Sequence, residues 1–211
     1  MKVVINLDNW NRKEHFKFFS ALDDPFWGIT TTVDFTSIYQ QSKNMEVSFF
    51  LYSVHFLLKC INATTAFKLR IENGEVVEYD KINISPTIGR EDGTFGFGFF
   101  EYDTDLSLFI ENAEKEIHRV KNSTGLSFSK DTARADVIRY SALPWFAFSE
   151  MKHAGSIQTG DSIPKISTGK LIQEKKKLLL PISISVHHGL VDGRNVAEFI
   201  QNVKDGQNNT L

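Results

Sequence analysis

The sequence contains a single cysteine, Cys60, and no apolar run long enough to span a membrane. One cysteine cannot form an internal disulfide, and it excludes the zinc sites that are built from several cysteines. Because Cys60 stands in a strongly apolar segment, we expect it to pack as a small hydrophobic side chain. A membrane helix needs about 20 apolar residues, and the first residues lack the layout of a signal peptide. We therefore expect a cytoplasmic protein.

The sequence also has little net charge. Its 24 Lys and Arg and 26 Asp and Glu give a formal charge of -2, so no basic field favours binding to nucleic acid. Three enzyme signatures are missing: the G-x-G-x-x-G dinucleotide loop, the phosphate-binding P-loop and the G-x-S-x-G nucleophile elbow. The six histidines show no metal-ligand spacing. We expect neither metal catalysis nor a serine or cysteine nucleophile.

Phenylalanine, by contrast, is abundant. The 18 Phe residues predict a core or a ligand pocket rich in aromatic rings.

A length of 211 residues suits one domain, and no repeat or linker divides the chain, so we expect a single domain over 1–211. Helical spacing of apolar residues predicts helices at 8–22, 36–43, 47–62, 105–122 and 193–203. Extended patterns predict strands at 29–35, 82–90, 94–100, 136–148, 165–173 and 177–188. Two short strands are predicted within 69–79, joined as a hairpin by the turn Asn73-Gly74. This mixture favours an α/β or α+β fold on a mixed sheet.

The segment that indicates chemistry is 182–193. An alternating apolar run leads to His187 and His188, and a short turn then leads to Asp192-Gly193. In an extended run, alternate side chains share a face, so His188 continues the apolar face and His187 lies on the other. A partly desolvated imidazole can act as a general base near pH 7. The alternative is a core histidine that hydrogen-bonds a backbone carbonyl.

Asp192 stands four residues after His188 and could brace the turn that holds it. A buried carboxylate needs a cationic partner. No arginine immediately precedes Asp192, so the partner has to come from another part of the chain. Because no protein nucleophile is evident, such a base would activate a hydroxyl group of the substrate.

These residues resemble a known enzyme family. His187-His188-x-x-x-Asp192-Gly193 is similar to the H-H-x-x-x-D-G motif of the chloramphenicol acetyltransferase family and its wider acyl-CoA-dependent relatives. Three further stretches narrow the resemblance to the trimeric chloramphenicol type: Trp10-x-Arg12-x-Glu14-His15-Phe16, Ser141-Ala142-Leu143-Pro144-Trp145 and Pro164-x-x-Ser167-x-Gly169-Lys170. Their order and spacing extend the resemblance over nearly the whole chain.

The resemblance implies a two-layer fold in which helices cover a mixed β-sheet, and a homotrimer with active sites between subunits. It implies transfer of an acetyl group from acetyl-CoA to a hydroxyl of chloramphenicol, the reaction of antibiotic resistance, by direct attack without an acyl-enzyme. His188 would be the general base, and Ser141 would hydrogen-bond the oxyanion. Ser167, where the family usually has threonine, would hold a water beside that oxyanion. No metal, nucleic acid or membrane is implied as a partner.

Other positions carry over as supporting residues. Asp192 and Arg12 match a structural ion pair of the family, which would support the base. Trp145 and Lys170 are candidate neighbours of coenzyme A, although a purely structural role fits each of them equally well. The acceptor pocket would be lined by Phe18, Phe19 and Phe95.

The chain departs from the family pattern mainly around the acceptor. Phe19 stands where chloramphenicol enzymes carry tyrosine, and the segment 23–27 is more acidic than their apolar loop. Gly96 and Gly98 would enlarge or loosen the surroundings of Phe95. The sequence therefore leaves two alternatives open: the same chemistry on another small alcohol, or a catalytically silent trimeric binding module.

Overall fold

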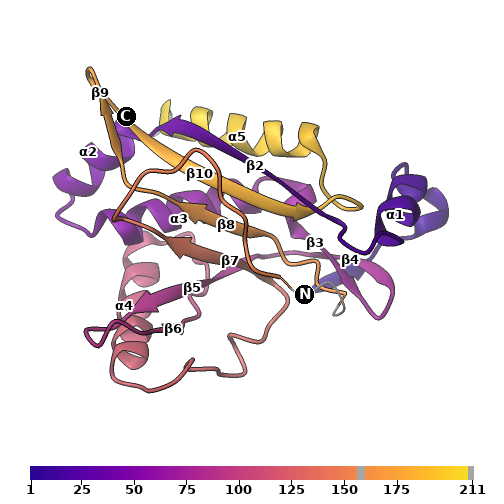
Figure 1. Cartoon of the computed structure of the whole chain (residues 1–211), viewed down its shortest axis with the longest axis horizontal. Coiled ribbons are helices and arrows are strands. Elements are labelled where there is room, and N and C mark those ends of the chain that lie inside the picture. Colours follow the sequence, from indigo (N-terminus) through magenta and orange to yellow (C-terminus); the bar gives the residue numbers. More distant parts are fainter. Residues whose placement is uncertain (156–159, 209–211) are drawn as a thin grey trace.

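The computed structural model describes residues 1–155 and 160–208. In this part of the chain a seven-stranded mixed sheet has the order β2-β10-β8-β7-β5-β6, and β9 also pairs with β10. Only β5–β7 and β7–β8 are parallel within it. Figure 1 shows β10 running through the middle of the molecule and ending near α1. The strands are β2 (Phe26–Asp34), β5 (Asn83–Gly89), β6 (Phe95–Phe97), β7 (Val137–Ala142), β8 (Lys165–Thr168), β9 (Ile172–Glu174) and β10 (Lys177–His187).

A small antiparallel sheet with the order β1-β4-β3 stands apart from the large one. Its strands are β1 (Lys2–Val4), β3 (Leu69–Glu72) and β4 (Glu75–Tyr79). Asn73 and Gly74 join β3 to β4 with φ angles of 51° and 81°. Two left-handed residues in a row are typical of the type I′ turn that Asn-Gly favours, so the predicted hairpin is confirmed.

The helices largely follow the predicted ranges: α1 (Lys13–Ser20), α2 (Thr36–Asn44), α3 (Phe49–Asn62), α4 (Leu106–Lys121) and α5 (Gly193–Asn208), with 3-10 turns η1 (Leu7–Asn9) and η2 (Thr65–Lys68). Asp105 caps α4 by accepting hydrogen bonds from the backbone N–H of Ser107 and Leu108. The first helix begins five residues later than expected, because the Asn6 side chain caps a separate 3-10 turn. The predicted fold class, a mixed sheet covered by helices, is confirmed.

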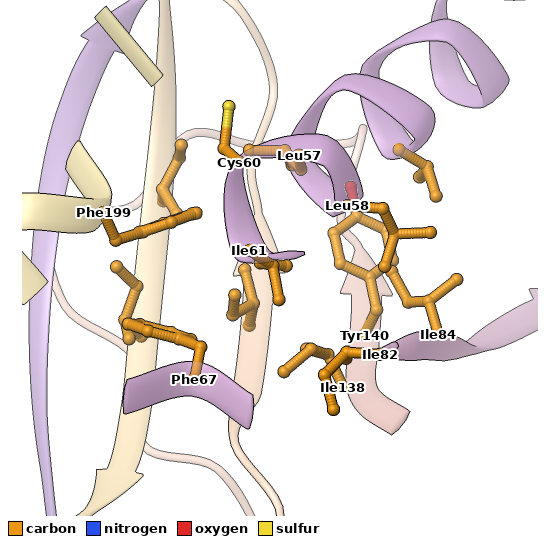
Figure 2. Packing of buried hydrophobic residues seen from close by; sticks show 14 of the residues in the cluster. Leu57, Leu58, Cys60, Ile61, Phe67, Ile82, Ile84, Ile138, Tyr140 and Phe199 are labelled. Atoms are coloured by element: carbon orange, nitrogen blue, oxygen red, sulfur yellow. The ribbon is translucent and has the colours of Figure 1, made fainter. Parts of the chain in front are cut away.

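Helix α3 forms the centre of the core. Nine of its 14 residues are buried, as expected for a helix that is apolar almost all round. Figure 2 shows its Leu57, Leu58 and Ile61 among aromatic and aliphatic side chains from both layers. Cys60 is buried there as predicted, and burial raises the pKa of its thiol to about 12.

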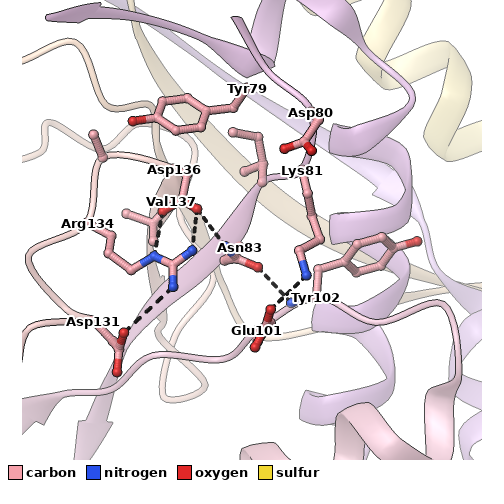
Figure 3. Close-up of polar contacts among 12 residues, drawn as sticks. Tyr79, Asp80, Lys81, Asn83, Glu101, Tyr102, Asp131, Arg134, Asp136 and Val137 are labelled. Atoms are coloured by element: carbon pink, nitrogen blue, oxygen red, sulfur yellow. Dashed lines mark hydrogen bonds and ion pairs between the residues drawn. The ribbon is translucent and has the colours of Figure 1, made fainter. Parts of the chain in front are cut away.

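A polar network fastens the start of β7 to the start of β5 (Figure 3). Arg134 donates two hydrogen bonds to Asp136, and Asp136 accepts a third from Asn83 Nδ2 at 3.1 Å. The buried Arg70 donates to the carbonyl oxygen of Val137, and also to those of Phe67, Leu69 and Ala135. These bonds fix the strand whose far end carries Ser141.

The Phe-Gly alternation around β6 serves close packing. A Cβ atom at Gly96 would lie 2.6 Å from Arg90 Nη2 and 2.9 Å from a methyl carbon of Val120 on α4. At Gly98 the same atom would meet Glu116 of α4 and Ile88, both at 3.5 Å. The prediction that these glycines enlarge a pocket around Phe95 is therefore wrong, because a helix and its side chains fill the space.

Candidate active site

The strand register places three serines in one row across the sheet. Ser183 of β10 pairs with Ser167 of β8, and Ser167 pairs with Ser141 of β7. Paired residues point to the same face, so this row defines a polar face opposite the apolar one that contains Ile182 and Ile184. Thr87 Oγ1 donates a hydrogen bond to Ser141 Oγ at 3.2 Å. Ser141 therefore keeps its own hydroxyl proton for another acceptor.

His187 ends β10 on this polar face, yet it is only 4% exposed. Its Nδ1 accepts a hydrogen bond from the Gly189 backbone N–H at 3.2 Å. Burial lowers the pKa of His187 to about 4, which keeps the ring neutral. Alternation predicted His188 as the more buried histidine of the pair, and this is wrong. The segment containing Met151 and His153 also covers the polar face, through contacts to Ser183 and Ser167.

His188 lies just beyond the strand end and is partly exposed. Its backbone N–H donates to the carbonyl oxygen of Pro25 at 2.8 Å. Its ring stacks on Phe19, with centroids 3.9 Å apart, and lies 5.4 Å from the Trp27 ring. Nδ1 is buried and has no hydrogen-bond partner among the described residues. Aromatic packing thus holds the imidazole, and Nε2 is the nitrogen that a substrate hydroxyl can reach.

Arg12 and Asp192, which are 180 positions apart, meet directly. Arg12 Nη1 lies 2.5 Å from Asp192 Oδ2, and Nη2 donates to the carbonyl oxygen of His188 at 3.4 Å. Asp192 Oδ1 accepts hydrogen bonds from the backbone N–H of Arg194 and Asn195 at the start of α5. Burial opposes ionisation, but the hydrogen bond and charge of Arg12 hold the pKa of Asp192 below its usual value. This carboxylate fixes the turn that carries His188.

Ser167 has a neighbour to which the sequence assigned no function. A hydrogen bond of 2.9 Å joins its Oγ to His153 Nε2. His153 Nδ1 is buried without a described partner, and burial together with the charge of Lys165 lowers the pKa of this ring. His153 stands in an irregular segment with no recognisable spacing, so no sequence signal pointed to it.

A cavity of about 1090 Å³ opens beside these residues on the polar face. Residues from α1, β2, β8, β10 and the segment before β8 line it, among them Ser20, Phe26, Trp27, His153, Asp161, Lys165 and His187. Neither Trp145 nor Lys170 belongs to its lining. His153 lines the cavity and connects it to Ser167 through their hydrogen bond, although Ser167 itself does not border it. The cavity thus lies away from the two coenzyme candidates.

The remaining predicted residues are dispersed over one chain. Phe18, Phe95 and Trp145 are 64%, 47% and 73% exposed, and Lys170 is exposed as well. Phe95 lies on β6, at the sheet edge farthest from β2, whereas Phe19 contacts His188.

The base candidate is separated from the oxyanion candidates as well. The ring of His188 packs against Trp27, which pairs with Val186 on the apolar face, whereas Ser141 and Ser167 lie on the polar face. Within one chain, His188 therefore does not face the two serines.

Among residues 1–155 and 160–208, no group of three or more His, Cys, Asp or Glu side chains is arranged to hold a metal ion. Of the helices in the same part of the chain, none is both long and apolar enough to cross a membrane.

Comparisons with known proteins agree with this geometry. The sequence model described as "Chloramphenicol acetyltransferase" matches residues 2–204. "Chloramphenicol acetyltransferase 3" of Escherichia coli is 27% identical over 207 residues, which cover 98% of this chain and 97% of that protein. The chloramphenicol acetyltransferase of Clostridioides difficile is 28% identical over 205 residues, with coverage of 95% and 93%.

Solved structures show the same relationship. A chloramphenicol acetyltransferase superposes with a TM-score of 0.90 at 29% identity, covering 98% of this chain and 100% of the other. A probable dihydrolipoamide acetyltransferase from Listeria monocytogenes has a TM-score of 0.69 at 13% identity, covers 98% of this chain and 94% of that one, and shares the fold alone. The resemblance indicated by the motifs is confirmed, and so is the prediction of an acyltransferase.

Replacing Arg12 by Met should lower the free energy of unfolding by about 2 kcal/mol, between the values for exposed and buried ion pairs. The reason is that Asp192 loses the cation that balances its partly buried charge. Lys13→Met is the matched control, because its partner Asp8 is 84% exposed. Urea unfolding measures both variants. An Arg12→Met loss no larger than that of Lys13→Met would show that the pair does not stabilise the turn.

Acidification should destabilise the protein through His187. Between the ordinary pKa of 6.5 and the folded value of about 4, the unfolded chain binds a proton that the folded chain does not. The contribution of His187 to the free energy of unfolding is therefore fully present above pH 6.5, and it falls by about 1.4 kcal/mol per pH unit below that value. His187→Asn keeps an acceptor for Gly189 and should flatten the slope measured by urea unfolding from pH 7 to 5. His15→Asn, on an exposed face of α1, is the control; equal slopes in all three proteins would contradict the assignment.

Proposed function

Because the chain belongs to the chloramphenicol acetyltransferase family, we propose that it transfers an acetyl group from acetyl-CoA to a hydroxyl of chloramphenicol. The main observation that supports the proposal is the packing of the His188 ring. Its ring is stacked on Phe19, and its Nδ1 is buried without a described partner. Relatives that match over almost their whole length bear the name chloramphenicol acetyltransferase. We expect the reaction to take place in the cytoplasm, where acetyl-CoA is available.

In this mechanism His188 Nε2 takes the proton of the acceptor hydroxyl, and the hydroxyl oxygen attacks the acetyl carbonyl. The carbonyl oxygen becomes an oxyanion, which Ser141 stabilises with a hydrogen bond. When the C–S bond breaks, the imidazolium returns its proton to the leaving thiolate. Ser141 suits its role because Thr87 already donates to its oxygen, which leaves the hydroxyl proton free. A preorganised donor of this kind is worth about 2.7–4 kcal/mol of barrier.

The site is proposed to form between two copies of the chain in a homotrimer. His188 packs on the apolar side of the sheet edge, whereas Ser141 and Ser167 lie in a row on the polar face. A base and an oxyanion donor have to reach the same substrate carbon. A second copy that presents its His188 to the polar face of the first would meet this condition.

The coenzyme is assigned to Trp145 and Lys170. The indole of Trp145 is 73% exposed, which is unusual for so large a ring and leaves it available for stacking on a base. The backbone N–H of Lys170 donates to the carbonyl oxygen of Phe146 at 2.9 Å, so the backbone of Lys170 lies beside the residue that follows Trp145. An aromatic plane and a cation fit the adenine and the phosphates of coenzyme A.

The acceptor is assigned to the cavity that His153 lines and to the exposed aromatic rings. Phe19 contacts the His188 ring directly, while Phe18 and Phe95 would join from the surfaces that copies bring together. Phe19 offers no hydroxyl where a tyrosine would, so it adds shape without a hydrogen bond. The same chemistry on a different small alcohol stays the alternative for this reason.

Replacing His188 by Ala should abolish acetyl transfer, because no other base lies in its place. The measurement is thiol release from acetyl-CoA with chloramphenicol, and a loss of about 10²–10⁴-fold is expected. His118→Ala, on the solvent side of α4, serves as control. Thiol release with other alcohols but not with chloramphenicol would contradict chloramphenicol as the acceptor, but it would agree with the proposed mechanism. If no alcohol of a broad panel caused thiol release, the result would favour a trimeric binding module.

Mixing two inactive variants should restore activity. His188→Ala lacks the base and Ser141→Ala lacks the oxyanion donor, so each alone is strongly impaired. In mixed trimers refolded from equal amounts, about one site in four would receive an intact residue of each kind. Thiol release should recover to about that fraction. No recovery in proteins shown by mass spectrometry to have exchanged subunits would place both residues in one chain's own site.

A further inference from the structure

Lys165 of β8 is a buried cation that shares its nearest counter-ion with a second cation. Its side chain is 8% exposed, and the nearest carboxylate oxygen, Asp161 Oδ2, lies 3.6 Å from Nζ. That same oxygen is held at 2.6 Å by Arg139. Nζ also lies 4.5 Å from the centroid of the Phe26 ring. No described residue accepts a hydrogen bond from it at 3.5 Å or less, so the three donor hydrogens of the ammonium group have no acceptor in the part of the chain that the structure describes.

The charge of Lys165 is only partly balanced by its surroundings. Arg139 and Lys165 share the single carboxylate of Asp161. His153 and His187 border the same cavity, and burial lowers the pKa of both rings, so they add no charge near neutral pH. The acidic residues Asp24 and Glu150 of the cavity lining are exposed, and water screens them. A buried ammonium that is only partly compensated is costly unless something binds it.

The chain also keeps space for this ammonium group. A Cβ atom at Gly155 would lie 2.8 Å from Lys165 Nζ, so any other residue there would have to displace the ammonium or its own backbone. Gly155 and Lys165 both line the cavity. The ammonium group therefore borders a space large enough for a ligand.

The cavity lies on the acceptor side of the proposed reaction. Lys165 and Ser167 alternate on β8 and so point to the same face, and His153 contacts Ser167. The coenzyme candidates do not line the cavity. A group bound at Lys165 would therefore belong to the alcohol that accepts the acetyl group.

We propose that this cavity recognises an acceptor alcohol that carries a carboxylate, which binds Lys165 while its hydroxyl lies toward His153, the hydrogen-bond partner of Ser167. The inference rests on the proposed acetyl transfer and names the chemical class of the alternative acceptor, the different small alcohol. A carboxylate carries one negative charge, which pairs with the buried ammonium group of Lys165. Chloramphenicol has no ionised group and would leave Lys165 without a partner.

The test compares each acceptor with its uncharged counterpart. Acetylation of 3-phenyllactate should exceed that of 3-phenyllactamide by at least about tenfold in kcat/KM, the size of one charge-assisted hydrogen bond. Lys165→Met should abolish this preference and raise the kcat/KM for chloramphenicol. Lys165→Gln provides a polar variant that can fold if Met does not. Lys121→Met, on exposed α4, is the matched control and should retain the preference.

A binding measurement separates this inference from the proposed function. Isothermal titration with 3-phenylpropanoate, which has no hydroxyl, needs no turnover and should show binding that weakens about tenfold or more in Lys165→Met. Binding without acetylation of any alcohol would overturn the proposed function alone. Acetylation of chloramphenicol, with no preference for the acid and no Lys165-dependent binding of 3-phenylpropanoate, would overturn this inference alone.

Discussion

The ion pair between Arg12 and Asp192 determines how the reactive end of β10 is built. One carboxylate caps helix α5 through two backbone N–H groups and binds the guanidinium of Arg12 with its other oxygen. Arg12 immediately precedes α1, which carries Phe19 to the ring of His188. The end of β10, the start of α5 and the contact of Phe19 with His188 therefore all depend on this one ion pair. Neutralising either partner would loosen all three together, because each lies within one or two contacts of the pair.

The sheet imposes a second constraint, which links catalysis to assembly. Alternation along β10 separates the side on which His188 packs from the row of Ser141, Ser167 and Ser183. The ring of His188 packs on Phe19 and Trp27, and no contact in the described part of the chain joins it to the row of serines. The chemistry proposed for these residues thus requires a second copy, and the exposed rings of Phe18 and Phe95 are surfaces that such a copy would cover.

Local patterns predicted most of the fold, and motifs predicted part of the site. The apolar helix α3, the Asn73-Gly74 hairpin and the Asp105 cap follow from short-range rules that tertiary contacts did not override. The burial of His187 did not follow, because it depends on residues far away in the sequence, such as Phe26, whose ring centroid lies 5.9 Å from that of His187. Gly96 was misread for the same reason, since the space beside it is filled by Val120 and Arg90. Alternation fixes which face a residue points to, but not what covers that face.

The same limit explains why the sequence predicted no function for Lys165. A lysine at the start of a strand is normally solvated, and only the fold encloses this one with Phe26 and Asp161. Lys165 and Ser167 are two positions apart on the same strand, so their backbones are separated by about 7 Å. This separation limits the ligands that can lie between them. A carboxylate at one end of that interval and a hydroxyl at the other describe a short hydroxy acid. The strand that positions Ser167 beside the proposed oxyanion would thereby also determine which acceptors are oriented for attack.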